Sequence, residues 1–204
     1  RLNPDIVHLN STKAGFLGSL ASIGLKTKTV FTAHGFRYNE PFSVVLKNLY
    51  VIAEKIASRC RDYIITVSKA DEVSALARHI IGKDKITTIH NGIEQINFLP
   101  RDEARKKIDL LDKNFLVGIL AAGFYKTKAI DVLIDAAKLI DNSKLTDVKF
   151  IIMGYGPELA YCKQKINNLN LNNYFILTGN IDNANTLLKA FDAFVLPSRK
   201  EGFP

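Results

Sequence analysis

The chain alternates short apolar runs with longer segments in which apolar residues recur every three or four positions. Short β-branched runs of this kind are typical of strands buried on both faces of a parallel sheet. We predict strands at Asp5–Leu9, Thr29–Ala33, Tyr63–Val67, Lys85–Ile89, Phe115–Leu120, Val148–Met153, Tyr174–Leu177 and Ala193–Leu196. We predict helices at Ala14–Ile23, Phe42–Arg61, Lys69–Ile80, Ile130–Ile140, Glu158–Asn167 and Ala184–Phe191. Because strands and helices alternate throughout, the pattern indicates βαβ units and an α/β fold of doubly wound type.

A turn and a charged stretch separate two series of such units. The fourth predicted strand is followed by the turn dipeptide Asn91-Gly92, and the charged segment Arg101–Lys107 precedes the fifth. We therefore predict two Rossmann-like lobes, 1–92 and 113–204, joined by a linker over 93–112, with a ligand cleft at the carboxyl ends of both sheets. One continuous sheet with a long surface loop is the alternative. The chain starts on a strand and stops without a closing helix, so we expect it to be the middle of a longer protein with both lobes incomplete.

The composition narrows the class of partner. The chain has 28 Lys and Arg against 20 Asp and Glu, a net charge of +8 that is spread over both halves. Such a field favours a polyanionic partner: nucleic acid, an anionic membrane surface or phosphorylated small molecules. Nucleic-acid binding is disfavoured, because aromatic and basic residues do not interleave. The two cysteines, Cys60 and Cys162, lie far apart and indicate neither a disulfide framework nor a zinc site, so we expect a reducing cytosol. The sequence shows neither a transmembrane segment nor a signal peptide.

Several candidate side chains follow predicted strands, where function concentrates in such sheets. His34 comes after the second strand and before Gly35, so its imidazole could donate to a sugar hydroxyl or a phosphate; a capping histidine at the edge of the core fits equally. His8 lies inside a strand, where we expect a structural role. No histidine has metal-ligand spacing, so we expect no metal site. Lys128, just ahead of a helix, could hold a diphosphate as a point charge, and a solvated surface lysine is the alternative.

Two loops combine glycines with polar groups. Gly154-Tyr155-Gly156-Pro157 leads from a strand into a helix, so its backbone N–H groups and the helix N-terminus could bind an anion. Leu159 stands where a dinucleotide fingerprint has its third glycine, which weakens a dehydrogenase interpretation and leaves a simple tight turn as the alternative. In the last loop, Glu201 beside Gly202 could accept hydrogen bonds from ligand hydroxyls while the backbone approaches closely. A salt-bridged surface glutamate fits as well.

The predicted helix Phe42–Arg61 is amphipathic and basic. Its apolar residues are at positions 42, 45, 46, 49, 52, 53, 56 and 60. A stripe with this spacing usually packs on the sheet. Because Lys47, Lys55, Arg59 and Arg61 lie elsewhere on the same segment, a helix lying on an anionic bilayer is the other interpretation.

In their order along the chain, these loops resemble the retaining glycosyltransferases of family 4, which have the GT-B fold. The matching segments are Ile6–Gly15, Thr32–Gly35, Val67-Ser68, His90–Ile93, Lys128, Gly154–Pro157 and Pro197–Pro204. Each is weak alone, but together they cover nearly the whole chain. The resemblance implies an N-terminal lobe for the acceptor and a C-terminal lobe for a nucleotide-sugar donor.

The resemblance also implies roles for individual residues. His34 matches the acceptor-lobe histidine that reaches the donor sugar, and Glu201 matches the first glutamate of the family's E-x7-E motif, so both are expected to be catalytic. Expected donor-binding residues are Lys128 at the diphosphate, together with Gly154, Gly156, Gly202 and Phe203. Expected acceptor-binding residues are Asn10, Thr12 and Gly15. The family implies transfer with retention, no metal, and no cofactor beyond the donor itself, which we expect to be UDP-linked.

Three departures from the family pattern limit this expectation. Gly123 or Phe124 stands where a basic residue is common, and Asn10 stands where many relatives have a second histidine. The second motif glutamate would fall at position 209, and the first Gly-rich loop is missing as well, so we expect this stretch alone to be inactive.

The expected function is sugar transfer to a glycan or lipid-linked acceptor in cell-surface polysaccharide synthesis. We expect this reaction in the cytoplasm, with the enzyme peripheral at the inner face of the membrane. The alternatives are a non-catalytic GT-B protein that binds nucleotide or glycan, and a nucleotide-sugar epimerase.

Overall fold

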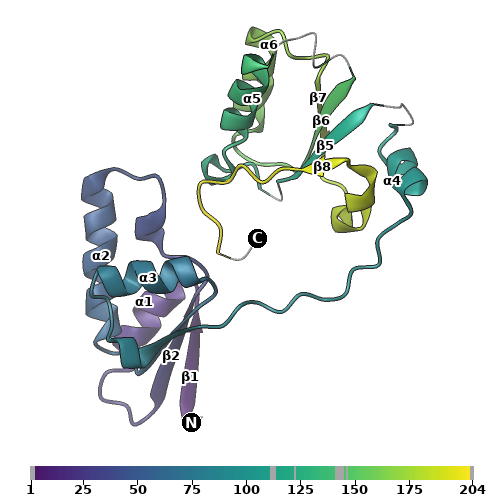
Figure 1. The fold of residues 1–204 in the computed structure, drawn as a ribbon. Coiled ribbons are helices and arrows are strands. Elements are labelled where there is room, and N and C mark those ends of the chain that lie inside the picture. Colours follow the sequence, from purple (N-terminus) through teal and green to yellow (C-terminus); the bar gives the residue numbers. More distant parts are fainter. Residues whose placement is uncertain (1–2, 111–113, 122, 141–144, 146, 203–204) are drawn as a thin grey trace. The chain divides into compact units, whose positions relative to one another are not determined.

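The computed structural model describes residues 3–110, 114–121, 123–140, 145 and 147–202. By its contacts the chain divides into two compact units. The first runs to Ile93 and takes in the chain again from Lys200, and the second spans Glu94–Arg199. The described strands form two separate four-stranded sheets, one in each unit (Figure 1), so the alternative of one continuous sheet is wrong. The domain limits 1–92, 93–112 and 113–204 stay predictions.

The first unit is a parallel sheet in the order β1-β2-β3-β4. Its elements are β1 (Ile6–Asn10), α1 (Thr12–Ala21), β2 (Lys28–Ala33), the 3₁₀ turn η1 (Arg37–Asn39), α2 (Val44–Ser58), β3 (Tyr63–Thr66), α3 (Lys69–Ala77), the 3₁₀ turn η2 (Lys83–Lys85) and β4 (Ile86–Thr88). The core of this unit includes Phe31, Ile64 and Ile86, one from each of three neighbouring strands. The edge strand β1 differs from the prediction of strands buried on both faces, since Ile6 is exposed.

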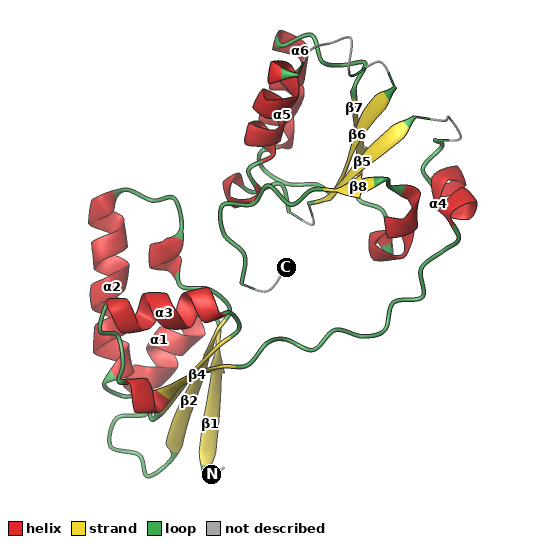
Figure 2. Cartoon of the chain, viewed as in Figure 1, coloured by secondary structure: helices red, strands yellow, loops and turns green. Residues whose placement is uncertain are grey.

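The second unit is a parallel sheet in the order β7-β6-β5-β8. Its elements are α4 (Arg101–Lys107), β5 (Phe115–Leu120), the 3₁₀ turn η3 (Lys126–Lys128), α5 (Ile130–Leu139), β6 (Val148–Met153), α6 (Leu159–Asn168), β7 (Phe175–Gly179), the 3₁₀ helix η5 (Ala184–Ala190) and β8 (Ala193–Phe194). Figure 2 shows helices on both sides of this sheet.

Successive apolar side chains of β5 and β6 pack on opposite faces of the second sheet. Val117 and Ile152 pack in one cluster with residues of α5 and α6. Leu116 and Ile151, each one position away, pack in another cluster with residues of α4 and η5. Successive side chains of a strand point to opposite faces, so a continuous apolar run is what a sheet covered on both sides requires. The prediction of doubly covered parallel strands is confirmed here.

Two segments differ from the elements that we predicted. Arg101–Lys107, assigned to the linker, forms α4, and the neighbouring Ile108 is buried in a core cluster of the second unit. The predicted α-helix at 184–191 is a 3₁₀ helix instead. The Thr186 carbonyl accepts from the Leu99 N–H at 2.9 Å, and an α-helix would use that carbonyl for the N–H of residue 190.

Helix α2 packs with a face other than its apolar stripe. Its buried residues are Glu54 and Ala57. The Glu54 carboxylate pairs with Arg61 at 2.7 Å, and the Arg61 guanidinium lies 3.9 Å from the centre of the Phe31 ring. Five residues of the predicted stripe instead face solvent: Val45 is 71% exposed, Leu46 36%, Leu49 57%, Ile52 53% and Ile56 45%. The interpretation that these five residues pack on the sheet is therefore wrong. No helix in the described part of the chain is long and apolar enough to cross a bilayer.

Candidate functional site

His34 lies at the carboxyl end of β2, and hydrogen bonds hold the loop that follows it. The imidazole is exposed, and its Nε2 is 3.3 Å from Asn10 Oδ1 at the end of β1. Asp71, buried in the first turn of α3, accepts hydrogen bonds from Ser68 Oγ at 2.8 Å and Asn39 Nδ2 at 3.1 Å. It also accepts from the Phe36 N–H at 3.5 Å. Asp71 therefore holds the segment that follows His34.

The segment around Glu201 lies against this same loop. Lys200 Nζ donates to the Phe36 carbonyl at 3.0 Å and lies 3.4 Å from Glu40 Oε1. A Cβ added to Gly202 would come within 3.1 Å of the His34 carbonyl oxygen, so the two backbones approach closely. The structure thus brings two sequence-predicted residues, His34 and Gly202, to one place. Half-buried Glu201 is between Lys200 and Gly202 in the chain. Phe203 lies outside the described residues.

The expected acceptor-binding residues have different surroundings. Asn10 contacts His34, and Thr12 opens α1 at the same end of the sheet. Gly15 is buried, and a side chain there would overlap the Phe31 ring. Close packing of α1 on β2 is therefore sufficient reason for this glycine, and its part in acceptor binding stays a prediction.

In the second unit, two glycine-bearing loops interlock at the carboxyl ends of β5 and β6. Gly154 has a φ of +141°, and a Cβ there would lie 1.8 Å from the Ala121 carbonyl oxygen. A Cβ on Gly156 would lie 2.4 Å from Phe124 N. The Phe124 N–H donates to the Tyr155 carbonyl at 3.1 Å. Only glycine permits both approaches, so the chain must have glycines where the sequence places them.

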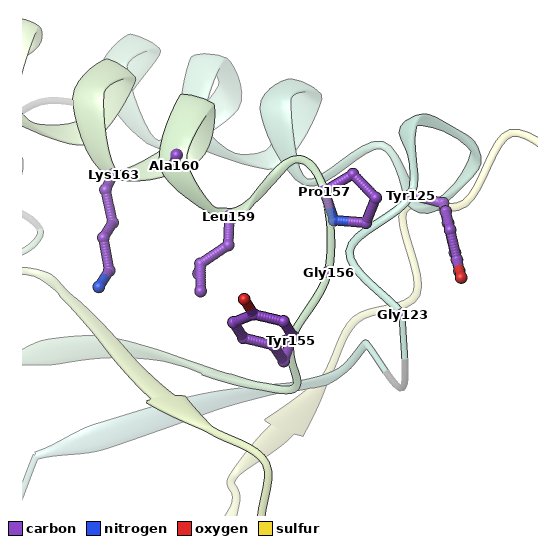
Figure 3. A pocket seen from close by; sticks show the side chains of 8 residues that line it. All are labelled: Gly123, Tyr125, Tyr155, Gly156, Pro157, Leu159, Ala160 and Lys163. Atoms are coloured by element: carbon purple, nitrogen blue, oxygen red, sulfur yellow. The ribbon is translucent and has the colours of Figure 1, made fainter.

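Pockets open on either side of these loops. One of about 650 Å³ lies in front of the first turn of α6. It is lined by Gly123, Tyr125, Tyr155, Gly156, Pro157, Leu159, Ala160 and Lys163. Figure 3 shows Leu159 between the Tyr155 ring and the Lys163 amine. A helix N-terminus, glycine backbone and a lysine are together suited to an anionic ligand.

A second pocket of about 410 Å³ is bounded by the ends of β5, β6 and β7. It is lined by Leu120, Met153, Gly154, Asn180, Ile181, Asp182, Asn183, Ala184 and Asn185. Polar side chains from the β7–η5 loop face the apolar ends of two strands here, a combination that can hydrogen-bond a ligand and exclude water. Sequence reasoning missed Asn180 and Asp182. The only available signal was a polar segment directly after a predicted strand.

Lys128 ends the turn η3, which Arg199 holds in place. The Arg199 N–H donates to the Thr127 carbonyl at 2.8 Å, and its Nη1 donates to the Lys126 carbonyl at 2.8 Å. The same guanidinium pairs with Asp131 in the first turn of α5, with Nη2 to Oδ2 at 3.1 Å. Burial raises the pKa of the Asp131 carboxyl, but its hydrogen bonds and its charge interaction with Arg199 outweigh this and leave the pKa below the usual range. Lys128 lies outside the linings of both pockets.

The geometry can be compared with known proteins. The family model for glycosyl transferases group 1 matches residues 100–204, and the model for glycosyltransferase family 4 matches residues 1–95. The chain belongs to the group 1 glycosyltransferases. Within the described residues of this group 1 glycosyltransferase chain, no group of three or more His, Cys, Asp or Glu side chains could hold a metal ion.

Two curated relatives of this glycosyltransferase chain are named for sugar transfer. One, 31% identical over 98% of the chain and 53% of its own length, is an Escherichia coli UDP-Gal:alpha-D-GlcNAc-diphosphoundecaprenol alpha-1,3-galactosyltransferase. Another, 27% identical over 98% of the chain and 54% of its own length, is the capsular polysaccharide biosynthesis glycosyltransferase CapM of Staphylococcus aureus. The chain spans about half the length of these relatives.

Solved structures agree with the expected fold. Anabaena HepE in complex with UDP and glucose gives a TM-score of 0.80 at 23% identity, over 98% of this chain and 54% of that one. Sucrose-phosphate synthase from Thermosynechococcus elongatus gives 0.78 at 20% identity, over 98% and 52%. The prediction of an α/β fold with two Rossmann-like lobes of GT-B type is confirmed.

Proposed function

We propose that the protein transfers a sugar from a UDP-linked donor to a glycan or lipid-linked acceptor in cell-surface polysaccharide synthesis, with retention of configuration. The observation that carries this proposal is the interlocked Gly154 and Gly156 loop, with a pocket on either side, in a member of the group 1 glycosyltransferases. The names of the relatives from E. coli and S. aureus support the substrate class. We also propose a cytoplasmic enzyme that acts at the inner face of the membrane.

In this proposal the second unit holds the donor. The pocket at the first turn of α6 accepts the negative charge of the donor, with backbone N–H groups near Gly156 and the helix N-terminus as its partners. The pocket at the ends of β5, β6 and β7 offers Asn180 and Asp182 to hydroxyl or base groups. Lys128, whose turn Arg199 fixes, stabilises the leaving diphosphate as charge develops on it.

The first unit supplies the remaining roles. His34 and Glu201 act on the donor sugar, and Gly202 offers its backbone to it, on a loop cluster held by Asp71 and Lys200. Asn10, Thr12 and Gly15 belong to the acceptor side. Because charge builds up on the leaving group without a nucleophile from the protein, the rate depends on preorganised donors rather than on a covalent intermediate. The proposal needs no metal and no cofactor beyond the donor.

A radiolabelled transfer assay on the full-length protein tests these assignments. We expect Lys128→Ala to lower kcat about 100-fold or more, by analogy with the loss of one preorganised hydrogen-bond donor to a developing negative charge in other enzymes. Glu201→Gln should lower kcat by a similar factor. Lys138→Ala, which removes an exposed lysine of α5, is the matched control and should leave transfer unchanged. Wild-type turnover by both site variants would contradict the assigned roles.

One observation favours a second candidate, a protein that binds nucleotide without turning it over. By the family resemblance, a basic residue is expected where this chain has Gly123 or Phe124; Gly123 lines a pocket without a side chain, and Phe124 is fully buried. Neither can neutralise phosphate charge. UDP binding by calorimetry, together with no sugar release over long incubation, would favour this candidate over transfer.

A further inference from the structure

The pocket in front of α6 contains a basic side chain that has no role in the proposed function. Among the described residues that line this pocket or the pocket at the ends of β5, β6 and β7, Lys163 is the only cationic one. It also lines a neighbouring pocket of about 260 Å³. Open space therefore lies on both sides of this exposed side chain.

The helical spacing of α6 directs Lys163 toward the pocket. Leu159 and Ala160 precede it by four and three positions, so the three side chains share one face of the helix. Figure 3 shows Leu159 and Lys163 extending from α6 in the same direction. Cys162 and Ile166 form a different face, which is buried in the core of the second unit. Because this packing fixes the rotation of α6, the face with Lys163 borders the pocket.

The charge of Lys163 is not neutralised within the helix. The positions three and four away from it have residues without charge, which are Leu159, Ala160, Ile166 and Asn167. Lys165, two positions further on, differs in this respect, since its amine pairs with Asp135 at 2.6 Å. Within the part of the chain that the structure describes, Lys163 has no ion pair, so its charge is available to a ligand.

The loop after β5 contributes no charge to this pocket. Gly123 lines the pocket without a side chain, and Phe124 is fully buried. A Cβ added to Gly123 would lie 2.3 Å from Cε2 of Tyr125, so the tyrosine ring occupies the space where a longer side chain would begin. A positive charge at this pocket therefore has to come from another element, and α6 supplies it.

We infer that Lys163 contacts the diphosphate of the donor in the pocket at α6, an inference that rests on the proposed function. An ammonium group on a flexible stem is a compact charge that can approach phosphate oxygens from several directions. A contact that is present before and during the reaction stabilises the bound substrate and the transition state equally. Lys163 is therefore a residue for donor affinity, whereas Lys128 acts on the charge that develops on the leaving group.

Calorimetric titration of the full-length protein with UDP, at low and at high salt, tests the inference. We expect Lys163→Ala to weaken UDP binding at low salt about tenfold, because a charge-assisted contact to phosphate is lost. The affinity of this variant should also fall less steeply with added salt than that of the wild type, since one screened attraction is missing. Lys163→Arg keeps the charge and should retain most of the affinity.

Lys138→Ala is the matched control for this titration. It removes an exposed lysine of α5 in the same unit, so it changes the net charge equally without changing the lining of the pocket. This variant should bind UDP as the wild type does. Equal weakening in Lys138→Ala and Lys163→Ala would show a general charge effect and would overturn the inference.

Transfer kinetics separate the inference from the proposed function. Lys163→Ala should raise KM for the UDP-sugar about tenfold and leave kcat within about twofold of the wild type. Unchanged UDP affinity in this variant, or weaker affinity with the salt dependence of the wild type, overturns the inference while transfer by the wild type stands. Binding of UDP by the wild type without any sugar transfer overturns the proposed function alone. A wild type that does not bind UDP overturns both.

Discussion

At the scale of single residues, Ala129 stores strain next to the proposed donor site. It is buried between η3 and α5 in a left-handed conformation, with φ of 52° and ψ of 36°. An L-residue loses roughly 1 kcal/mol in this region, whereas glycine adopts it freely. We expect Ala129→Gly to raise the free energy of unfolding by roughly 0.5 kcal/mol, because relief of the strain outweighs the greater flexibility of the unfolded chain.

Urea denaturation measures this change, and α5 provides a matched control. Ala137 is equally buried but lies inside the helix, so Ala137→Gly should lower the free energy of unfolding by roughly 1 kcal/mol. Opposite signs for two substitutions of the same type would show that backbone conformation decides the effect. Destabilisation of similar size by both would contradict the strain at Ala129.

At the scale of elements, Asp192 joins α4 to β5. Its carboxylate accepts from Arg105 Nη2 and from the Leu116 N–H, each at 2.8 Å, and it also pairs with Arg101. Burial raises the pKa of Asp192, but these hydrogen bonds and the two guanidinium groups outweigh burial and hold the pKa below its usual range. The ionised form therefore stabilises the fold above the usual pKa, and this contribution is lost as the pH falls through the lowered value.

We expect Asp192→Asn to lower the free energy of unfolding by about 2 kcal/mol at pH 7, because the buried Arg105 guanidinium loses the carboxylate that balances its charge and the Leu116 N–H loses a charged acceptor. The difference from the wild type should shrink as the pH falls below the usual aspartate pKa of about 4 toward the lowered pKa of Asp192, where the folded wild type takes up a proton. Asp135→Asn, at an exposed ion pair with Lys165, is the control and should change stability by less than about 0.5 kcal/mol. A constant difference across this pH range would rule out the charge as its cause.

Local sequence pattern predicts some elements of this fold and misses others. The strands were predictable because each is a short apolar run, and the observed strands differ from the predicted ones mainly at their ends. Helix α4 was not predictable, because the charged sequence of Arg101–Lys107 is typical of a loop. Its burial depends on Ala104 and Ile108, which pack against residues of other elements. The packing face of α2 was also missed. Its apolar stripe suggested burial, but the pair between Glu54 and Arg61 takes the inward face.

Some residues of the candidate site could also be predicted from the sequence, and others could not. The Gly154 and Gly156 loop was predictable as a tight connection between a strand and a helix, and its part in donor binding stays a prediction. Asp71 was not, because its partners Asn39 and Phe36 are more than thirty positions away in the chain. Asn180 and Asp182 line a pocket only because β7 lies beside β6.

At the scale of the whole molecule, the proposed roles are distributed over two compact units. The first contains His34, Asn10 and the segment that begins at Lys200, and the second contains Lys128 and the two pockets. Each unit is stabilised by its own core, so each can keep its part of the site in shape. In the proposed function the nucleotide binds to the second unit.

Hydrogen–deuterium exchange of the full-length protein with and without UDP tests whether the nucleotide binds there. We expect slower exchange in the loops at 154–158 and 180–185, because bound nucleotide would cover their backbone N–H groups. Exchange in α2, which belongs to the first unit, should stay unchanged. Protection confined to the first unit, or no protection at saturating UDP, would show that the second unit does not bind the nucleotide.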